Sequence, residues 1–269
     1  MSLSPEVSAV PDAWRVERVR HAFAARHMQL LSREVVSPGC LRLTLGGADL
    51  STFRSDGFDD HVKVLFPVDG QERPLLPRLV DGRPHFDAGE RPVARDFTPL
   101  VWNASKGTLV LEFALHEWGP AAEWARNAPM GQWLGIAGPR GSMVVPADLP
   151  WHCLLGDASA LPAIERRLAE LPAGTTVTVR VQLADAADRR PLASAARLDL
   201  QWVDDLARAA RDLHLPEGDG FIWAAGEHGD MAALRRELLA RPGVNPRRMR
   251  ISAYWKRGMA AHHEELVEN

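Results

Sequence analysis

WHCLLGDASALPAIERRLAELPAG, residues 151–174, decides the fold class. It opens with a continuous apolar run, which is typical of a strand buried on both faces of a parallel sheet. Apolar residues then recur at helical spacing, as Leu161, Ile164, Leu168 and Leu171. A buried strand that leads directly into an amphipathic helix predicts an α/β domain.

The same alternation of strands and helices continues toward the C-terminus. Strands are expected at residues 175–184, 196–203, 221–226 and 248–255, with a polar connection over 183–197. A second helix is expected after residue 226, with Met231, Leu234 and Leu238 on its apolar face. This pattern predicts a doubly wound parallel sheet over residues 148–258, followed by a polar tail over 259–269.

Toward the N-terminus the pattern changes to short strands separated by glycine and proline. These strands are expected at residues 28–36, 40–47, 61–68, 108–116, 132–138 and 141–146. Short strands without a long helical pattern among them predict an antiparallel β-barrel over residues 27–147. Residues 1–26 are polar and are expected to be an extension or a first helix that packs on the body.

Composition excludes several classes of protein. The chain of 269 residues has a formal net charge of −3, which argues against general binding to nucleic acid or to anionic membranes. Cys40 and Cys153 lack the spacing of metal ligands, so both are expected to be ordinary core thiols in a reducing compartment. The pair His262-His263 has no further ligands near it in sequence, and no metal site is expected.

The sequence predicts neither a signal peptide nor a membrane-spanning segment. The first residues lack a basic segment followed by an apolar core, so no signal peptide is expected. No apolar run approaches the length that crosses a bilayer. We therefore expect a cytoplasmic protein, and we expect it to be a monomer.

One strand of the expected barrel, VARDFTPL over residues 93–100, carries an unusual set of side chains. On an extended backbone Arg95 and Phe97 share one face, and Thr98 follows at the strand end. A guanidinium can clamp a pyrophosphate, an aromatic ring can stack on a flat heterocycle, and a hydroxyl can bond its edge. The alternative is a solvated arginine beside a core phenylalanine.

A second stretch points to an anion as well. Gly119-Pro120-Ala121-Ala122 opens a helix that carries Trp124, directly after a strand. The free N–H groups of such a helix start can bind phosphate, and small residues let it approach the backbone. Pro120 suits the first helical position because its missing N–H costs nothing there. The alternative is an ordinary helix start without a ligand.

These stretches, in this order, resemble a known family. The relevant segments are DDHVKVLFP (59–67), ARDFT (94–98), HEWGPAAEWA (116–125), GPRGSMVVP (138–146), GDASALPAIERRL (156–168), WAAGE (223–227) and SAYWKRG (252–258). From about residue 25 to 258 the chain is similar to the siderophore-interacting proteins, ferric-siderophore reductases of the ferredoxin-reductase-like superfamily. The resemblance implies an FAD-binding barrel followed by an NAD(P)-binding-like domain.

The resemblance also assigns residues to the FAD site. Arg95, Phe97 and Thr98 would face the flavin and its phosphates. The helix start formed by Gly119, Pro120, Ala121 and Ala122 would take the pyrophosphate through its free N–H groups. His116 and Trp124 are expected in the same site. The family usually has tyrosine at the position of Phe97 and commonly arginine at that of Leu100. The charge-assisted bond that an arginine at position 100 would make is worth roughly 1.5–3 kcal/mol, so its absence would weaken FAD binding about tenfold or more.

In the second domain the resemblance implies that Asp157 and Ser159 lie at the lip of the site that admits a nicotinamide. This strand-to-helix turn is not a G-x-G-x-x-G loop, and Ala158 stands where the family commonly has glutamate. Glu227 could meet a ribose hydroxyl or cap its helix, and the cap is the favoured interpretation. The electron donor is left open between NAD(P)H and ferredoxin.

Ferric siderophores are bulky and often anionic, so a reductase for them needs cations beside the flavin. Lys63, Arg140, Lys256 and Arg257 are the candidates for this substrate site. The alternative for each is a solvated surface charge. His61 is expected to be structural.

The resulting hypothesis is FAD-dependent reduction of ferric siderophores, which releases ferrous iron inside the cell. The flavin carries the chemistry, so no catalytic side chain is expected. Two alternatives remain at this stage. One is a flavin reductase or electron transferase for another acceptor, and the other is a siderophore-binding protein without turnover.

Overall fold

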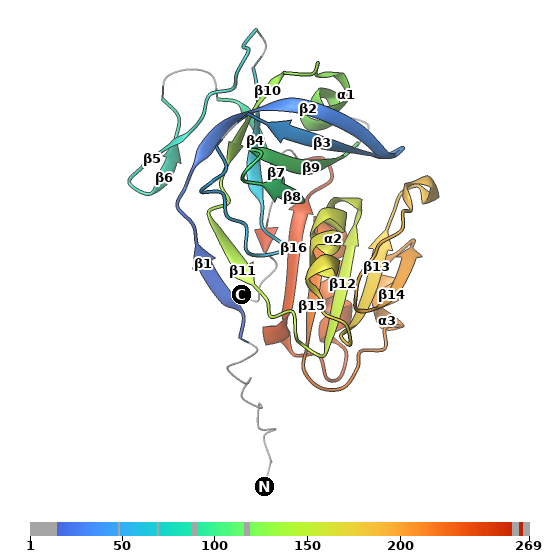
Figure 1. Cartoon of the computed structure of the whole chain (residues 1–269). Helices are drawn as coiled ribbons and strands as arrows, with labels where there is room; N and C mark the ends of the chain where they lie inside the picture. Colours follow the sequence, from blue (N-terminus) through green and yellow to red (C-terminus); the bar gives the residue numbers. More distant parts are fainter. Residues whose placement is uncertain are drawn as a thin grey trace.

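The chain folds into an antiparallel half-barrel that stands on a layered α/β unit (Figure 1). A computed structural model describes residues 15–47, 49–68, 70–87, 91–115, 119–259 and 264–265. His116 and the pair His262-His263, both considered from the sequence, lie outside these residues. None of the described helices is long and apolar enough to cross a membrane.

The first half is a curled sheet of seven antiparallel strands. In the order β7-β4-β10-β2-β3-β9-β8 they are Val93–Phe97, Val62–Phe66, Trp133–Ala137, Ala25–Ser37, Cys40–Gly46, Thr108–Ala114 and Val101–Asn103. Alternate residues point inward, as Leu41, Leu43 and Leu45 of β3 show by being almost fully buried. The expected antiparallel strands are therefore confirmed, in a sheet with edges at β7 and β8.

Helix α1 (Pro120–Asn127) packs on this core through Ala125 and the ring of Trp124. The small hairpin of β5 (Arg78–Val80) and β6 (Arg83–His85) was not predicted, because its side chains are mostly exposed and show no apolar alternation.

The segment before the sheet differs from expectation. Residues 17–20 form a strand, β1 (Glu17–Arg20), which pairs antiparallel with β11 (Gly141–Val144). Its polar side chains give no apolar period, so the pairing depends on backbone hydrogen bonds that sequence patterns do not reveal. A side chain at Gly141 would meet the carbonyl oxygen of Val19 at 2.5 Å, so the close approach needs glycine there.

The second half is a sheet in the order β14-β13-β12-β15-β16-β17. The parallel strands are β12 (Trp151–Asp157), β13 (Thr176–Gln182), β14 (Arg197–Val203), β15 (Gly220–Glu227) and β16 (Met249–Trp255). The short β17 (Glu264–Glu265) pairs antiparallel with β16. The parallel sheet expected in the second half of the chain is thus confirmed.

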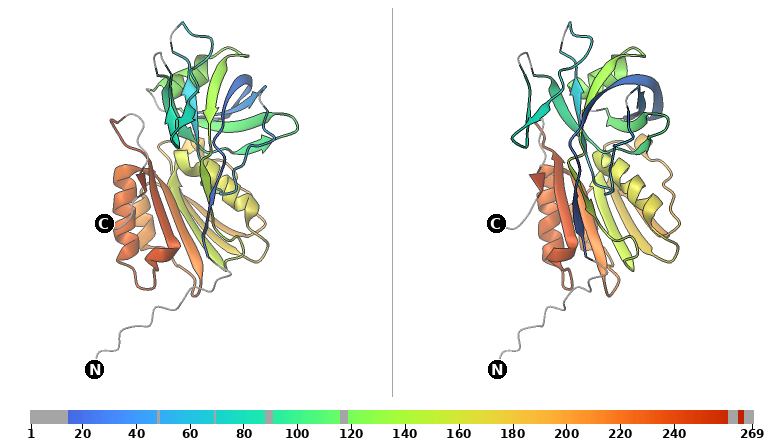
Figure 2. Two further views of the ribbon diagram at one scale, coloured as in Figure 1. Left: turned by 90° about the vertical axis from the view of Figure 1, so that its left-hand side faces the viewer. Right: turned by 60° about the vertical axis from the view of Figure 1, so that its left-hand side comes forward.

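Helices cover both faces of this sheet (Figure 2). Helix α2 (Leu161–Glu170) packs against Leu154 of β12, whereas α3 (Leu206–Arg211) and α4 (His228–Leu239) pack against Cys153 and Leu155. Because successive strand residues point to opposite faces, a continuous apolar run is what such a strand needs. Single turns of 3-10 helix occur at η2 (Ala158–Ala160), η3 (Ala186–Asp188) and η4 (Pro246–Arg248).

Ionic contacts join the two halves. Arg190, from the connection expected to be merely polar, approaches Glu112 of β9 at 2.6 Å and Glu165 of α2 at 2.5 Å. Arg42 of β3 completes this four-residue cluster through Glu112 and Glu165. A second contact joins Arg250 Nε to Asp59 Oδ2 at 2.9 Å. The half-barrel is therefore fixed above the carboxyl ends of the parallel strands.

Candidate functional site

A cavity of about 540 Å³ lies where the two halves meet. Its size is within the range of about 300–1,000 Å³ that is usual for small-molecule sites. Eleven of the residues predicted from the sequence line it: Lys63, Arg95, Phe97, Thr98, Gly119, Pro120, Ala121, Ala122, Ser159, Lys256 and Arg257. Segments far apart in the sequence thus meet around one space.

Strand β7 supplies one wall. The half-buried Arg95 donates from Nη1 to the carbonyl oxygen of Ala94 at 2.8 Å, which leaves its other donors available to the cavity. The Phe97 ring packs on Phe113, with centroids 4.1 Å apart, and also lines the cavity. Phe97 is therefore both a core residue and part of the cavity wall, so the two interpretations that the sequence left open do not exclude each other.

The start of α1 supplies a second wall. Gly119 is the N-cap residue, Pro120 occupies the first turn, and no side chain of the described residues caps the helix. The first helical bond runs from Glu123 N to Gly119 O at 3.0 Å, so the N–H groups of Ala121 and Ala122 precede it. These donors lie at the cavity, where they can bind an anion.

Other predicted residues lie outside this lining. The Trp124 ring packs edge-on against Phe66 with centroids 5.9 Å apart, as part of the core. Arg140 donates from Nη2 to the carbonyl oxygen of Gly82 at 3.2 Å, at the turn of the β5–β6 hairpin. Leu100, where the family resemblance led us to expect arginine, does not line the cavity either.

Asp157 also lies outside the lining, because its carboxylate is used within the protein. Its Oδ1 accepts from Ser159 N at 2.8 Å and from Ser159 Oγ at 2.5 Å. Its Oδ2 accepts from Glu227 N at 2.9 Å and from Trp255 Nε1 at 2.8 Å. Asp157 thus joins the carboxyl ends of β12, β15 and β16, and it positions the cavity wall rather than facing the cavity.

Glu227 caps α4, as favoured from the sequence. Its Oε2 accepts from Gly229 N at 2.5 Å and from Asp230 N at 3.1 Å. Its Oε1 accepts from Arg257 N at 3.1 Å, which ties the next segment to the same residue.

The cavity is locally basic although the chain is slightly acidic. The lining has the cationic side chains of Lys63, Arg95, Lys256 and Arg257 against the carboxylates of Asp96 and Glu112. Lys63 Nζ lies 2.8 Å from Asp96 Oδ1, and the lysine side chain keeps 57% of its surface exposed. An anionic ligand would therefore meet an excess of positive charge.

Some lining residues were not predicted as site residues. Tyr254, Trp255 and Met259 come from the end of β16 and the turn after it, and His61, expected to be structural, also lines the cavity. Cys40 lies in the wall as well, and burial, followed by the nearby Glu112, raises the pKa of its thiol to about 12. A neutral thiol at Cys40 is a wall component and not a nucleophile.

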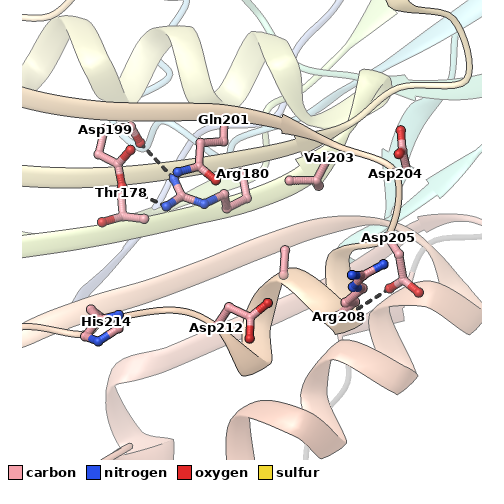
Figure 3. A pocket seen from close by; sticks show the side chains of 11 residues that line it. Thr178, Arg180, Asp199, Gln201, Val203, Asp204, Asp205, Arg208, Asp212 and His214 are labelled. Atoms are coloured by element: carbon pink, nitrogen blue, oxygen red, sulfur yellow. Dashed lines mark hydrogen bonds and ion pairs between the residues drawn. The ribbon is translucent and has the colours of Figure 1, made fainter.

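A second cavity, of about 600 Å³, lies between α3 and strands β13 and β14 (Figure 3). There Arg180 Nη2 donates to Asp199 Oδ2 at 2.7 Å, and Asp204, Asp205 and Asp212 line the same space. None of the predicted site residues that the structure describes lies in it. Among the described residues, no group of three or more His, Cys, Asp or Glu side chains could hold a metal ion.

The half-barrel and the doubly wound sheet, with the cavity between them, form a ferredoxin-reductase-like fold. Models of two families match the chain, the siderophore-interacting FAD-binding domain over residues 29–143 and the siderophore-interacting protein over 149–258. The chain belongs to the siderophore-interacting protein family.

Individual relatives agree with this assignment. The chain is 36% identical to an NADPH-dependent ferric-chelate reductase of Escherichia coli, over 89% of this chain and 96% of the relative. It is 32% identical to the ferric vibriobactin reductase ViuB of Vibrio cholerae, over 89% of this chain and 93% of the relative. A siderophore utilization protein from T. fusca has a crystal structure with a TM-score of 0.83 at 32% identity, covering 91% of this chain and 98% of that one.

Proposed function

We propose that this protein is an FAD-dependent oxidoreductase that reduces ferric siderophores with electrons from NAD(P)H. The observation that carries the proposal is the cavity between the halves, where an arginine–aromatic strand, an uncapped helix start and several cations converge. In this proposal residues 27–147 bind FAD and residues 148–258 receive the electron donor. Ferredoxin as an alternative donor, a monomeric chain and a cytoplasmic location belong to the same proposal.

The side chains present fit FAD. Its pyrophosphate needs cationic and N–H donors, which Arg95 and the backbone of Ala121 and Ala122 offer on neighbouring walls. Its ring system needs a flat apolar wall, which Phe97 offers. Bound FAD would supply the redox chemistry, accepting two electrons from NAD(P)H and passing them on one at a time.

The second half offers a place for the donor. Ala158, Ser159 and Pro162 line the cavity at the carboxyl end of β12. The strand order reverses between β12 and β15, and open α/β sheets bind ligands at such a switch point. We therefore assign the nicotinamide to the space beside Ser159, with Asp157 holding Ser159 in place.

The substrate side of the cavity is basic. Lys63, Lys256 and Arg257 can attract and orient an anionic ferric chelate beside the flavin. Arg140 lies outside the cavity and has no part in this proposal. Oxygen donors hold ferrous iron more weakly than ferric iron, so reduction releases the metal.

The test is formation of ferrous iron, followed with a ferrous-specific chromophoric chelator. The purified protein is supplied with FAD, NADPH and a ferric tris(catecholate), and each component is omitted in turn. We expect two ferrous ions for each NADPH consumed, and none without protein or FAD. Protein that binds the ferric chelate but gives no ferrous iron with NADPH, NADH or reduced ferredoxin would instead identify a siderophore-binding protein.

A further inference from the structure

Tyr254 is the only tyrosine of the chain and lies in β16 at the junction of the two halves. Its side chain is partly buried and lines the cavity. Its hydroxyl donates to Asp59 Oδ1, in the loop before β4, and the Thr98 hydroxyl donates to the Tyr254 oxygen. Asp59 Oδ2 accepts from Arg250 Nε at 2.9 Å. The phenol is therefore bonded to two groups of the half-barrel.

The residues after Tyr254 are fixed in a similar way. Trp255 Nε1 donates to Asp157 Oδ2 at 2.8 Å, and Arg257 N donates to Glu227 Oε1 at 3.1 Å. Three carboxylates thus hold the segment 254–257, which carries two of the cations that line the cavity. Of these three bonds, only that of Tyr254 reaches the half-barrel.

We infer that Tyr254 is a positioning residue that holds Lys256 and Arg257 at the cavity and thereby sets the affinity for the ferric substrate. The inference rests on the proposed function. Without the phenolic hydroxyl, the segment stays anchored to β12 and β15 but loses its bond to the wall that carries Thr98. The two cations then have more freedom to move, and an anionic substrate has to order them when it binds.

The surroundings of Tyr254 keep its hydroxyl in the protonated, donating form. Burial first, and the Asp59 carboxylate second, raise the pKa of the phenol well above its ordinary value, although Arg250 and the Thr98 hydroxyl act in the opposite direction. Arg166 of α2 is a further charged group near enough to interact electrostatically with the phenol. The phenol therefore stays protonated, and able to donate to Asp59, at neutral pH.

The test compares Tyr254→Phe with Ser55→Ala. Ser55 lies at the same junction, where its Oγ accepts from Arg166 Nη1 at 2.9 Å, but it does not line the cavity. We expect Tyr254→Phe to raise KM for an anionic ferric tris(catecholate) about tenfold, because a bond to a charged group is lost, with a smaller change in kcat. Ser55→Ala should leave KM unchanged.

Equal KM values in the two variants and in the unchanged protein would overturn the inference. So would a Tyr254→Phe variant that loses FAD while its KM at saturating FAD stays unchanged. If the unchanged protein forms no ferrous iron at all, the proposed function fails instead. The two failures are therefore distinguishable.

A second measurement needs no variant. Because Tyr254 is the only tyrosine, the near-ultraviolet absorbance of tyrosinate reports this one group. We expect no ionisation near the ordinary tyrosine pKa of about 10 while the protein stays folded, as judged by circular dichroism. Ionisation at that pH in the folded protein would show that the phenol is not held by Asp59, and would overturn the inference.

Discussion

Arg95, Phe97 and Thr98 divide their interactions between the cavity and the protein itself. Arg95 donates one hydrogen bond to the carbonyl oxygen of Ala94, Phe97 packs on Phe113, and Thr98 is hydrogen-bonded to Tyr254. The sequence motif predicts that these three residues are close together, since they lie within four consecutive positions of the chain. It does not predict the partner of Thr98, because Tyr254 is 156 positions away in the chain.

Substitutions at Lys63 and at Asp96 should change the affinity for an anionic ferric chelate in opposite directions. Their ion pair partly neutralises the lysine at the cavity. We expect Lys63→Ala to weaken binding of an anionic ferric chelate, and Asp96→Asn to strengthen it, each about two- to fivefold at low salt and less at high salt. Fluorescence titration of the FAD-loaded protein measures both affinities.

Lys106→Ala serves as the control, since Lys106 lies in the turn before β9 and outside the cavity. Shifts of the same sign in Lys63→Ala and Asp96→Asn, or a shift in Lys63→Ala that salt does not reduce, would remove this pair from the substrate site.

His152 of β12 determines part of the response to acid. Desolvation by burial, and then the charge of Arg167, lower the pKa of His152 from 6.5 to about 3. The folded protein keeps the ring neutral, whereas the unfolded chain binds a proton below pH 6.5. Stability is therefore lost as the pH falls from 6.5 toward 3, by about 1.4 kcal/mol for each pH unit.

We expect His152→Leu to flatten the pH dependence of the free energy of unfolding, by roughly 2–3 kcal/mol between pH 7.5 and 4.5. Urea unfolding at several pH values measures it. The test compares how steeply the free energy of unfolding changes with pH in the two proteins, so a difference in stability that is the same at every pH does not affect it. Parallel profiles for the two proteins would show that His152 titrates normally in the folded state.

At the scale of elements, sequence patterns predicted the longer elements in which burial follows a period. Helix α3 was missed although it buries Leu206 and Ala210, because six residues are too few to establish a helical period. The run at 151–156 and the apolar face of α2 predicted the α/β half, because both faces of β12 are buried by helices. Strand β1 and the β5–β6 hairpin were missed, because exposed strands held by backbone pairing carry no such period. The start of α1 was predicted correctly, since Gly-Pro followed by small residues is itself the signal.

A substitution at the start of α1 should change the stability of the helix and the affinity for FAD in opposite directions. No atom of the described residues lies within 4 Å of a side chain placed at Gly119, and the backbone there is extended, so other residues fit. In Gly119→Asp the carboxylate would cap the free N–H groups, stabilising α1 by a few tenths of a kcal/mol. The same carboxylate would occupy the anion site, so we expect FAD affinity to fall about tenfold or more.

Gly119→Ala is the matched control, because it adds a side chain without a charge or an acceptor. Flavin fluorescence quenching measures the affinity, and thermal unfolding without FAD measures the stability. Equal FAD affinities in the two variants would show that the N–H groups of α1 do not bind the cofactor.

At the scale of the whole molecule, the contacts that join the two halves could not be predicted from the sequence. Arg42, Glu112, Glu165 and Arg190 come from four separate segments, and each looks like a surface charge in its own sequence context. In the fold the side chains of Arg190 and Glu112 keep only 8% and 2% of their surface exposed. The contacts that create the cavity are therefore tertiary, although its lining was largely predictable from motifs.

This cluster should contribute strongly to stability. Arg190→Met leaves the carboxylates of Glu112 and Glu165 facing each other without the central cation. We expect a loss of about 3–5 kcal/mol in the free energy of unfolding, as is usual when one partner of a buried ion pair is removed. Urea unfolding measures the loss.

Arg211→Ala is the control, because it removes an exposed ion pair with Glu237 and should cost less than about 1 kcal/mol. If Arg190→Met costs no more than this control, the cluster does not hold the halves together.

The central claim is that one cavity, built by both halves, binds FAD. Amide hydrogen exchange with and without FAD, read by mass spectrometry, tests it most directly. We predict slower exchange on FAD addition in three separate segments: β7 at 93–97, the start of α1 at 119–122 and the end of β16 at 254–258. Exchange unchanged in all three, at FAD concentrations that saturate binding, would contradict the account and place the cofactor elsewhere.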